Sequence, residues 1–133
     1  MADKEYDTRI WISSEAFPEV SEDLWKLYMA IEKDLNAYLD RIGYKNVLKK
    51  WRLVIILRDD DLSDEYVRKE RGDDIINFSL KIPYAAFRDG DEKQRKALIY
   101  DVILRSLDIL EQRKIKHLEV IRDYIEKKKA ELG

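Results

Sequence analysis

The chain has 133 residues, of which 45% are hydrophobic and 41% are charged, and its formal net charge is −2. This composition excludes a disordered chain and predicts a single globular domain over residues 1–133 with a heavily charged surface. The absence of cysteine excludes disulfide bonds and thiolate metal sites. We expect residues 1–7 to form a disordered lead-in and residues 127–133 to form a frayed tail.

Charge is distributed unevenly along the sequence. Residues 1–65 hold 15 acidic and 10 basic side chains, whereas residues 66–133 hold 13 and 16. Nucleic-acid binders usually show a basic excess with interleaved aromatic residues, so the acidic first half disfavours nucleic acid as a partner. The N-terminus lacks the apolar core of a signal peptide, and no apolar run is long enough to span a bilayer. We therefore expect a cytoplasmic protein with no membrane partner.

The first half of the chain predicts a strand, a long helix and a central strand. Residues 8–13 alternate apolar and polar side chains, which is typical of a strand. Ser21 is a candidate N-cap for a helix over about residues 22–42, and Gly43 is the expected C-terminal stop. Residues 51–58 are rich in β-branched residues and apolar on both alternating faces, which indicates a strand covered on one side and half covered on the other.

The second half predicts two more strands and two helices. Residues 66–71 are mostly charged, a turn follows, and residues 75–82 alternate again. After a loop over residues 84–90, Asp89 or Asp91 caps a second long helix. A third helix begins near residue 118, and the sequence leaves open whether residues 112–117 break it from the second.

Together these segments have the order β-α-β-β-β-α-α. We expect an α+β fold, with an about four-stranded, largely antiparallel sheet and two to three helices packed on one face. The sequence does not fix the strand order. If the first two strands are parallel neighbours, the strand–helix–strand unit should form a right-handed crossover.

An acidic cluster follows the central strand and consists of Asp59, Asp60, Asp61, Asp64 and Glu65. Several carboxylates could bind a hard metal ion, but the EF-hand spacing, its turn glycine and its closing glutamate are all missing. The cluster is therefore either a solvated hairpin loop or an acidic docking patch for a basic partner. If the first two strands end side by side, Glu15, Glu19, Glu22 and Asp23 would extend this patch.

The sequence shows no set of residues for catalysis or cofactor binding. His117 is the single histidine and has no nucleophile or carboxylate at a suitable spacing. The four isolated glycines cannot build a phosphate-binding loop. We therefore expect no enzyme activity, no cofactor and no metal.

Trp11 is a candidate binding residue. It points away from its apolar neighbours in the predicted strand, so it either covers the second sheet face or anchors a partner.

Three segments carry a family resemblance: residues 9–15 (RIWISSE), residues 79–82 (SLKI) and residues 97–107 (ALIYDVILRSL). Together with the spacing of the helices, they resemble the bacterial immunity protein 44 family over about residues 8–116. These motifs are structural rather than catalytic. Ser14 stands where the family pattern has a glycine after the opening strand, which alters the turn before Glu15.

The resemblance implies a small cytoplasmic protein that binds and neutralises a cognate toxin, as in toxin–antitoxin and contact-dependent inhibition systems. It implies stoichiometric occlusion by protein–protein contact, and a basic nuclease is one toxin that would suit the acidic patch. The alternative is a small enzyme or ligand-binding domain with a cleft between sheet and helices, lined by Tyr84 and Tyr100. A homo-oligomeric structural module is a further alternative. The identity and activity of the toxin cannot be read from the chain.

Overall fold

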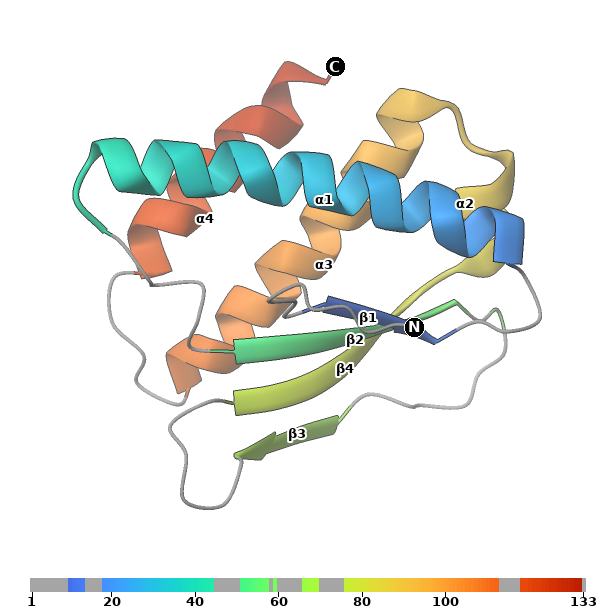
Figure 1. Ribbon diagram of the computed structural model, residues 1–133, viewed down its shortest axis with the longest axis horizontal. Coiled ribbons are helices and arrows are strands. Elements are labelled where there is room, and N and C mark those ends of the chain that lie inside the picture. Colours follow the sequence, from blue (N-terminus) through green and yellow to red (C-terminus); the bar gives the residue numbers. More distant parts are fainter. Residues whose placement is uncertain are drawn as a thin grey trace.

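The computed structural model describes residues 10–13, 18–44, 51–57, 59, 66–69, 76–112 and 118–132 (Figure 1). In chain order, the elements are β1 (Ile10–Ser13), α1 (Pro18–Arg41), β2 (Trp51–Leu57), β3 (Tyr66–Lys69), β4 (Ile76–Ile82), α2 (Tyr84–Asp89), α3 (Glu92–Gln112) and α4 (Leu118–Glu131). Most of the described residues are helical. The helices lie together on one side of the strands.

The strands are arranged in the order β1-β2-β4-β3. β1 is parallel to β2, β2 is parallel to β4, and only β3 and β4 pair antiparallel. Our prediction of an α+β fold with a largely antiparallel sheet is therefore wrong: the fold is mostly helical, and its central strands, β2 and β4, are parallel neighbours.

The composition of the strands explains this arrangement. β4 has a continuous apolar face and lies beside β2, where the helices can cover it. β3 has the sequence YVRK and takes the outer position. Charged side chains at a sheet edge disfavour pairing with a further strand. β3 runs opposite to both β2 and β4, so β2 and β4 run in the same direction, and the position of β4 between β2 and β3 makes them parallel neighbours.

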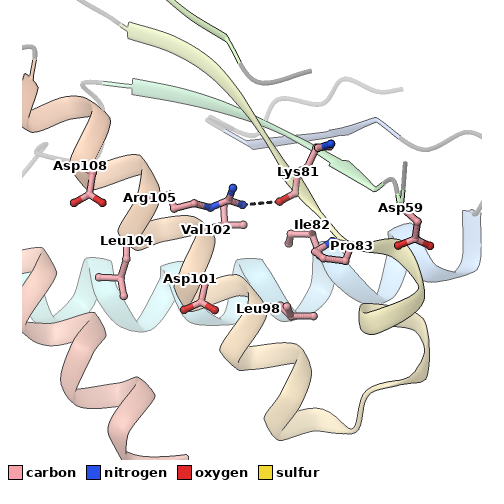
Figure 2. Close-up of a pocket in the computed structure, with 10 residues that line it drawn as sticks. All are labelled: Asp59, Lys81, Ile82, Pro83, Leu98, Asp101, Val102, Leu104, Arg105 and Asp108. Atoms are coloured by element: carbon pink, nitrogen blue, oxygen red, sulfur yellow. Dashed lines mark hydrogen bonds between the residues drawn. The ribbon is translucent and has the colours of Figure 1, made fainter. Parts of the chain in front are cut away.

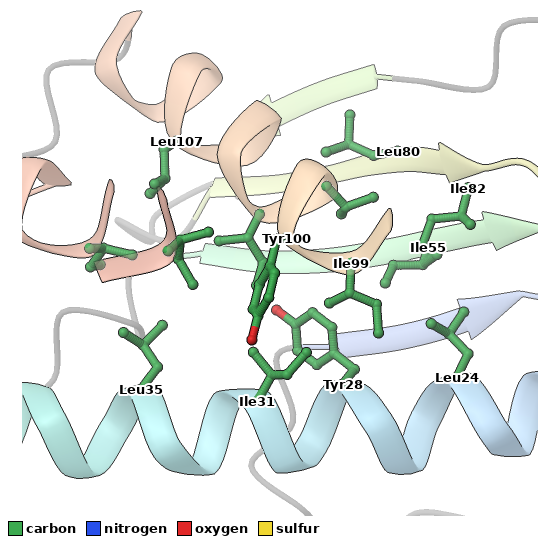
Figure 3. Packing of buried hydrophobic residues seen from close by; sticks show 14 of the residues in the cluster. Leu24, Tyr28, Ile31, Leu35, Ile55, Leu80, Ile82, Ile99, Tyr100 and Leu107 are labelled. Atoms are coloured by element: carbon green, nitrogen blue, oxygen red, sulfur yellow. The ribbon is translucent and has the colours of Figure 1, made fainter. Parts of the chain in front are cut away.

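The core lies between β2, β4 and the helices (Figure 3). Ile55 pairs with Leu80, and Leu57 pairs with Ile82 two residues further along the strands. All four side chains are at most 3% exposed, as the alternating pattern predicts. The buried helix residues packed with them include Leu24, Tyr28, Ile31 and Leu35 of α1 and Ile99, Tyr100 and Leu107 of α3.

The first long helix starts earlier than the sequence predicts. α1 begins at Pro18, so Ser21 lies inside the helix and is not its N-cap. Proline suits the first turn of a helix because its missing N–H has no intrahelical partner there. The predicted stop is correct: Gly43 has φ +89°, and the Tyr44 amide donates to the Leu39 carbonyl at 2.9 Å. This left-handed conformation favours glycine because it has no Cβ.

The predicted loop over residues 84–90 is wrong, because residues 84–89 form the short helix α2. Phe87 of α2 is fully buried in the core.

The next helix, α3, begins with a reciprocal cap. The Gln94 amide donates to Asp91 Oδ1 at 2.9 Å, and the Asp91 amide donates to Gln94 Oε1 at 2.8 Å. Asp91, rather than Asp89, is therefore the cap of α3.

The last helix, α4, packs against α3 and α1. Leu118, Ile121 and Ile125 of α4 are buried in the core. Ser106 of α3 is 1% exposed, and its hydroxyl donates to the Val102 carbonyl at 2.9 Å. Its small, satisfied side chain fits a closely packed helix face. Residues 113–117, including His117, lie outside the described residues.

Candidate functional site

The first candidate site is the edge of the fold where the parallel strands end. Ser13 of β1 pairs with Ile56 of β2, so the carboxyl ends of these two strands are adjacent. α1 begins at the same edge (Figure 1). The first two strands thus end side by side, which is the arrangement under which we expected the acidic residues around them to form a common patch. We call this region the acidic edge; its described members are Glu19, Glu22 and Asp23 of α1 and Asp59 after β2.

The structure describes only part of the predicted patch. Glu19 and Asp59 are exposed. Trp11 lies in β1 opposite Val54, but its side chain is outside the described part of the structure, and its role as an anchor stays a prediction. The remaining predicted patch residues also lie outside the described residues: Glu15, Asp60, Asp61, Asp64 and Glu65.

Asp59 has a structural role that the sequence does not reveal. Its carboxylate accepts the Ala85 backbone amide, at 3.2 Å from Oδ1 and 3.0 Å from Oδ2. The first backbone amides of a helix have no intrahelical acceptor, and Pro83 at the N-cap of α2 has no side-chain oxygen to supply one. Asp59 therefore caps α2 from a distant part of the chain and joins the end of β2 to this helix.

Basic residues neutralise part of the acidic edge. Lys26 lies 3.4 Å from Glu22, and Arg95 lies 3.3 Å from Asp23. On α2, a hydrogen bond from Arg88 lowers the pKa of the exposed Asp89 carboxyl. Neither Glu19 nor Asp59 makes an ion pair with another residue that the structure describes. The edge therefore retains negative charge at the start of α1.

A second candidate site is an open groove of about 600 Å³ between β4 and α3 (Figure 2). Ile82, Pro83, Leu98, Val102 and Leu104 supply its apolar lining, and its polar lining comes from Asp59, Lys81, Asp101, Arg105 and Asp108. Arg105 Nη2 donates to the Lys81 carbonyl at 2.6 Å across the groove.

The charged groups of this groove are engaged with neighbouring elements. Asp101 pairs with Lys129 of α4, and Asp108 accepts Arg122 Nη2 at 2.7 Å. The groove is the cleft between sheet and helices that the enzyme alternative requires, but neither Tyr84 nor Tyr100 lines it. Tyr100 lines a separate pocket on the helical side.

The described residues contain no group of three or more histidine or acidic side chains placed to hold a metal ion. Among the helices that the structure describes, none is long and apolar enough to cross a membrane.

The fold and its sites define a small protein with a helical layer over a mixed sheet, an acidic edge and an open groove. A family model described as immunity protein 44 matches residues 8–130, and the chain belongs to this family. The resemblance predicted from the sequence is thereby confirmed, and the match extends beyond residue 116 into α4. No curated protein and no solved structure matches the chain.

Proposed function

We propose that this chain is an immunity protein that binds its cognate toxin and neutralises it by stoichiometric occlusion. The observation that carries the proposal is the family match, which spans residues 8–130 and so includes β1 to α3 completely and α4 as far as residue 130. The complex would form in the cytoplasm, where the toxin would otherwise act. The protein itself would perform no chemistry.

The acidic edge is the surface that we propose for the toxin. Its exposed carboxylates come from two segments that the parallel pairing of β1 and β2 brings to one side of the fold. Complementary charge accelerates the encounter of two proteins and disfavours wrong partners. A toxin with a basic surface, such as a nuclease, fits this charge. In this proposal Glu15, Asp60, Asp61, Asp64 and Glu65 extend the acidic edge, and Trp11 supplies an apolar anchor beside it.

The proposed function is tested by coexpression with the toxin domain encoded beside this chain's gene. We expect growth to be restored, and the two purified proteins to elute as one stoichiometric complex in size-exclusion chromatography. Toxicity that persists despite comparable amounts of folded protein would contradict the proposal. Restored growth without a complex would contradict occlusion.

The proposed surface is tested separately by charge reversal. We expect Asp60→Lys, Asp61→Lys and Asp64→Lys together to slow toxin association, with the largest effect at low salt, because screening weakens exposed charges. Glu19→Lys should slow association to a smaller extent. The matched control reverses three exposed acids of α4 together, Glu119→Lys, Asp123→Lys and Glu126→Lys, and so makes the same change in net charge. Association rates that are equal in all variants would remove the acidic edge from the mechanism.

The groove between β4 and α3 favours a second candidate function, the binding of a small ligand. Its volume of about 600 Å³ lies within the usual range of ligand pockets. A small molecule retained through purification, with signals from residues 98–108 perturbed on its removal, would support this function. The groove shares Asp59 with the acidic edge but no residue of α1. Glu19→Lys therefore distinguishes the two candidates, since it should slow toxin association and leave ligand binding in the groove unchanged.

A further inference from the structure

A pocket of about 370 Å³ lies between α1, α3 and α4, and none of its lining residues belongs to the acidic edge. We call it the three-helix pocket. Its apolar lining consists of Leu27, Ala30, Ile31 and Leu132, and its aromatic and charged lining consists of Asp34, Glu92, Lys96, Tyr100, Tyr124, Lys128 and Glu131. It is therefore built from one segment of each long helix.

Tyr100 is the unusual member of this pocket. Its side chain is only 6% exposed, yet its hydroxyl makes no hydrogen bond to another described residue. Figure 3 shows the hydroxyl directed from α3 towards α1. A buried hydroxyl without a partner is costly, and native structures usually satisfy such groups with protein, water or a ligand. This hydroxyl is thus available to a group that enters the pocket.

The charges in the pocket select the sign of the ligand. Lys96 lies 3.3 Å from Glu92, and Lys128 lies 3.9 Å from Glu131, so each ammonium already has a carboxylate beside it. Asp34 remains as the additional negative charge and has no ion pair among the described residues. Burial raises the pKa of Tyr100, and Tyr124, Asp34 and Glu131 raise it further. Of these groups the two carboxylates are negatively charged near neutral pH, and their charge acts on this hydroxyl.

We propose that the three-helix pocket binds an organic cation, with Asp34 as its counter-ion and the Tyr100 hydroxyl as its hydrogen-bond acceptor. The ligand carries an ammonium or guanidinium group on an aliphatic stem. The cationic group lies against the Asp34 carboxylate and the Tyr100 hydroxyl, because a charged donor makes its strongest hydrogen bonds to such acceptors. The stem lies along Leu27 and Ile31.

The first experiment is a titration of the ¹⁵N-labelled full chain with 1,5-diaminopentane and with N-acetyl-lysine methylamide, followed by NMR. We expect saturable shifts concentrated at residues 27–34, 96–100 and 124–132. Glutarate, a dianion of similar length, is the control and should cause no saturable shift there. Absence of saturation with both amines, or equal binding of glutarate, would overturn the proposal. Tighter binding of the diamine would indicate a free small molecule, and equal binding would indicate a basic side chain; both support the site.

The second experiment compares two equivalent substitutions on α1. Asp34→Asn should weaken amine binding by about tenfold, because it replaces a charged hydrogen-bond acceptor by a neutral one. Asp40→Asn makes the same change in net charge at an exposed position outside the pocket and should leave binding unchanged. Equal losses in the two variants would show that only the overall charge matters and would overturn the proposal.

A third variant tests the hydroxyl. Tyr100→Phe keeps the ring and should weaken amine binding several-fold while the thermal unfolding of the free protein changes little or shifts upward, since the unsatisfied group is removed. Unchanged amine affinity in a folded Tyr100→Phe protein would overturn the role of the hydroxyl. Toxin neutralisation by Asp34→Asn should be unaffected, so failure of this site is distinguishable from failure of the proposed function.

Discussion

Arg95 of α3 holds Phe87 of α2 through both its backbone and its ring. Arg95 Nε donates to the Phe87 carbonyl at 2.7 Å, and the guanidinium lies 4.7 Å from the centroid of the phenylalanine ring. The same guanidinium donates to the Arg88 carbonyl at 3.0 Å and reaches Asp23 of α1 at 3.3 Å. One side chain therefore links α1, α2 and α3 beside the acidic edge.

Replacing Arg95 should destabilise this junction. We expect Arg95→Met to lower the free energy of unfolding by about 1–3 kcal/mol, because hydrogen bonds to two helix-end carbonyls are lost. Arg95→Lys should recover only part of this loss, since a lysine cannot reproduce the planar fork of donors. Urea unfolding measures the difference. The control, Lys93→Met at an exposed position of α3, should stay within about 0.5 kcal/mol of the wild type.

Removing the remote cap of α2 should also reduce stability. Asp59→Ala removes the acceptor for the Ala85 amide, and we expect a loss of about 0.5–2 kcal/mol, the usual range for a lost helix cap. Asp59→Asn keeps an acceptor oxygen and should lose less. Hydrogen exchange at the Ala85 amide reports the cap directly. Exchange that is unchanged in Asp59→Ala would show that another group replaces the carboxylate.

Asp59→Asn also separates the two roles of this residue. It removes one negative charge from the acidic edge but retains an acceptor for the Ala85 amide. If the acidic edge steers the toxin, association with Asp59→Asn should be slower and unfolding nearly unchanged. The opposite pattern would assign Asp59 to the fold alone.

Two neighbouring residues of α4 should differ sharply in their contribution. Ile121 is fully buried, and Ile121→Ala should cost about 2–5 kcal/mol through lost burial and the remaining cavity. Arg122 lies 2.7 Å from Asp108 and 3.0 Å from Glu111, but both carboxylates are about half exposed. Arg122→Ala should therefore cost less than about 1 kcal/mol. Chemical denaturation of both variants checks the contrast, and similar losses would contradict it.

Stability should fall at alkaline pH through Tyr100 and Tyr124. Burial raises the pKa of both phenols above the ordinary value of 10.0, with further contributions from nearby groups that include Asp34. Above about pH 10 the unfolded chain releases these protons while the folded chain retains them, so stability is full below this pH and is lost as pH rises through the folded pKa values.

The double variant Tyr100→Phe/Tyr124→Phe isolates this effect. Its free energy of unfolding should decline less steeply than that of the wild type above the same pH, because two of the retained protons are gone. In a pH titration followed by tyrosinate absorbance, the double variant should show two fewer tyrosines than the wild type that deprotonate above their ordinary pKa. Parallel declines in the two proteins would assign the alkaline loss to lysine side chains instead, since arginine stays protonated in this range.

The sequence alone determined the elements whose signals are local. Alternating apolar residues located β2 and β4, and a helical repeat ending at Gly43 located α1. Asp91 was one of two expected caps because its side chain needs a partner only three residues away. Membership of the immunity protein 44 family was likewise accessible from short motifs along the chain.

Only the tertiary structure decided which strands are neighbours and in which direction they run. A two-residue repeat shows which side chains share a face, but it is the same for parallel and antiparallel pairing. α2 was missed because its six residues are too few for a helical repeat and its cap, Asp59, is 26 residues away. The surroundings of the Tyr100 hydroxyl could not be predicted from the sequence for the same reason, since they come from three helices that are distant in sequence.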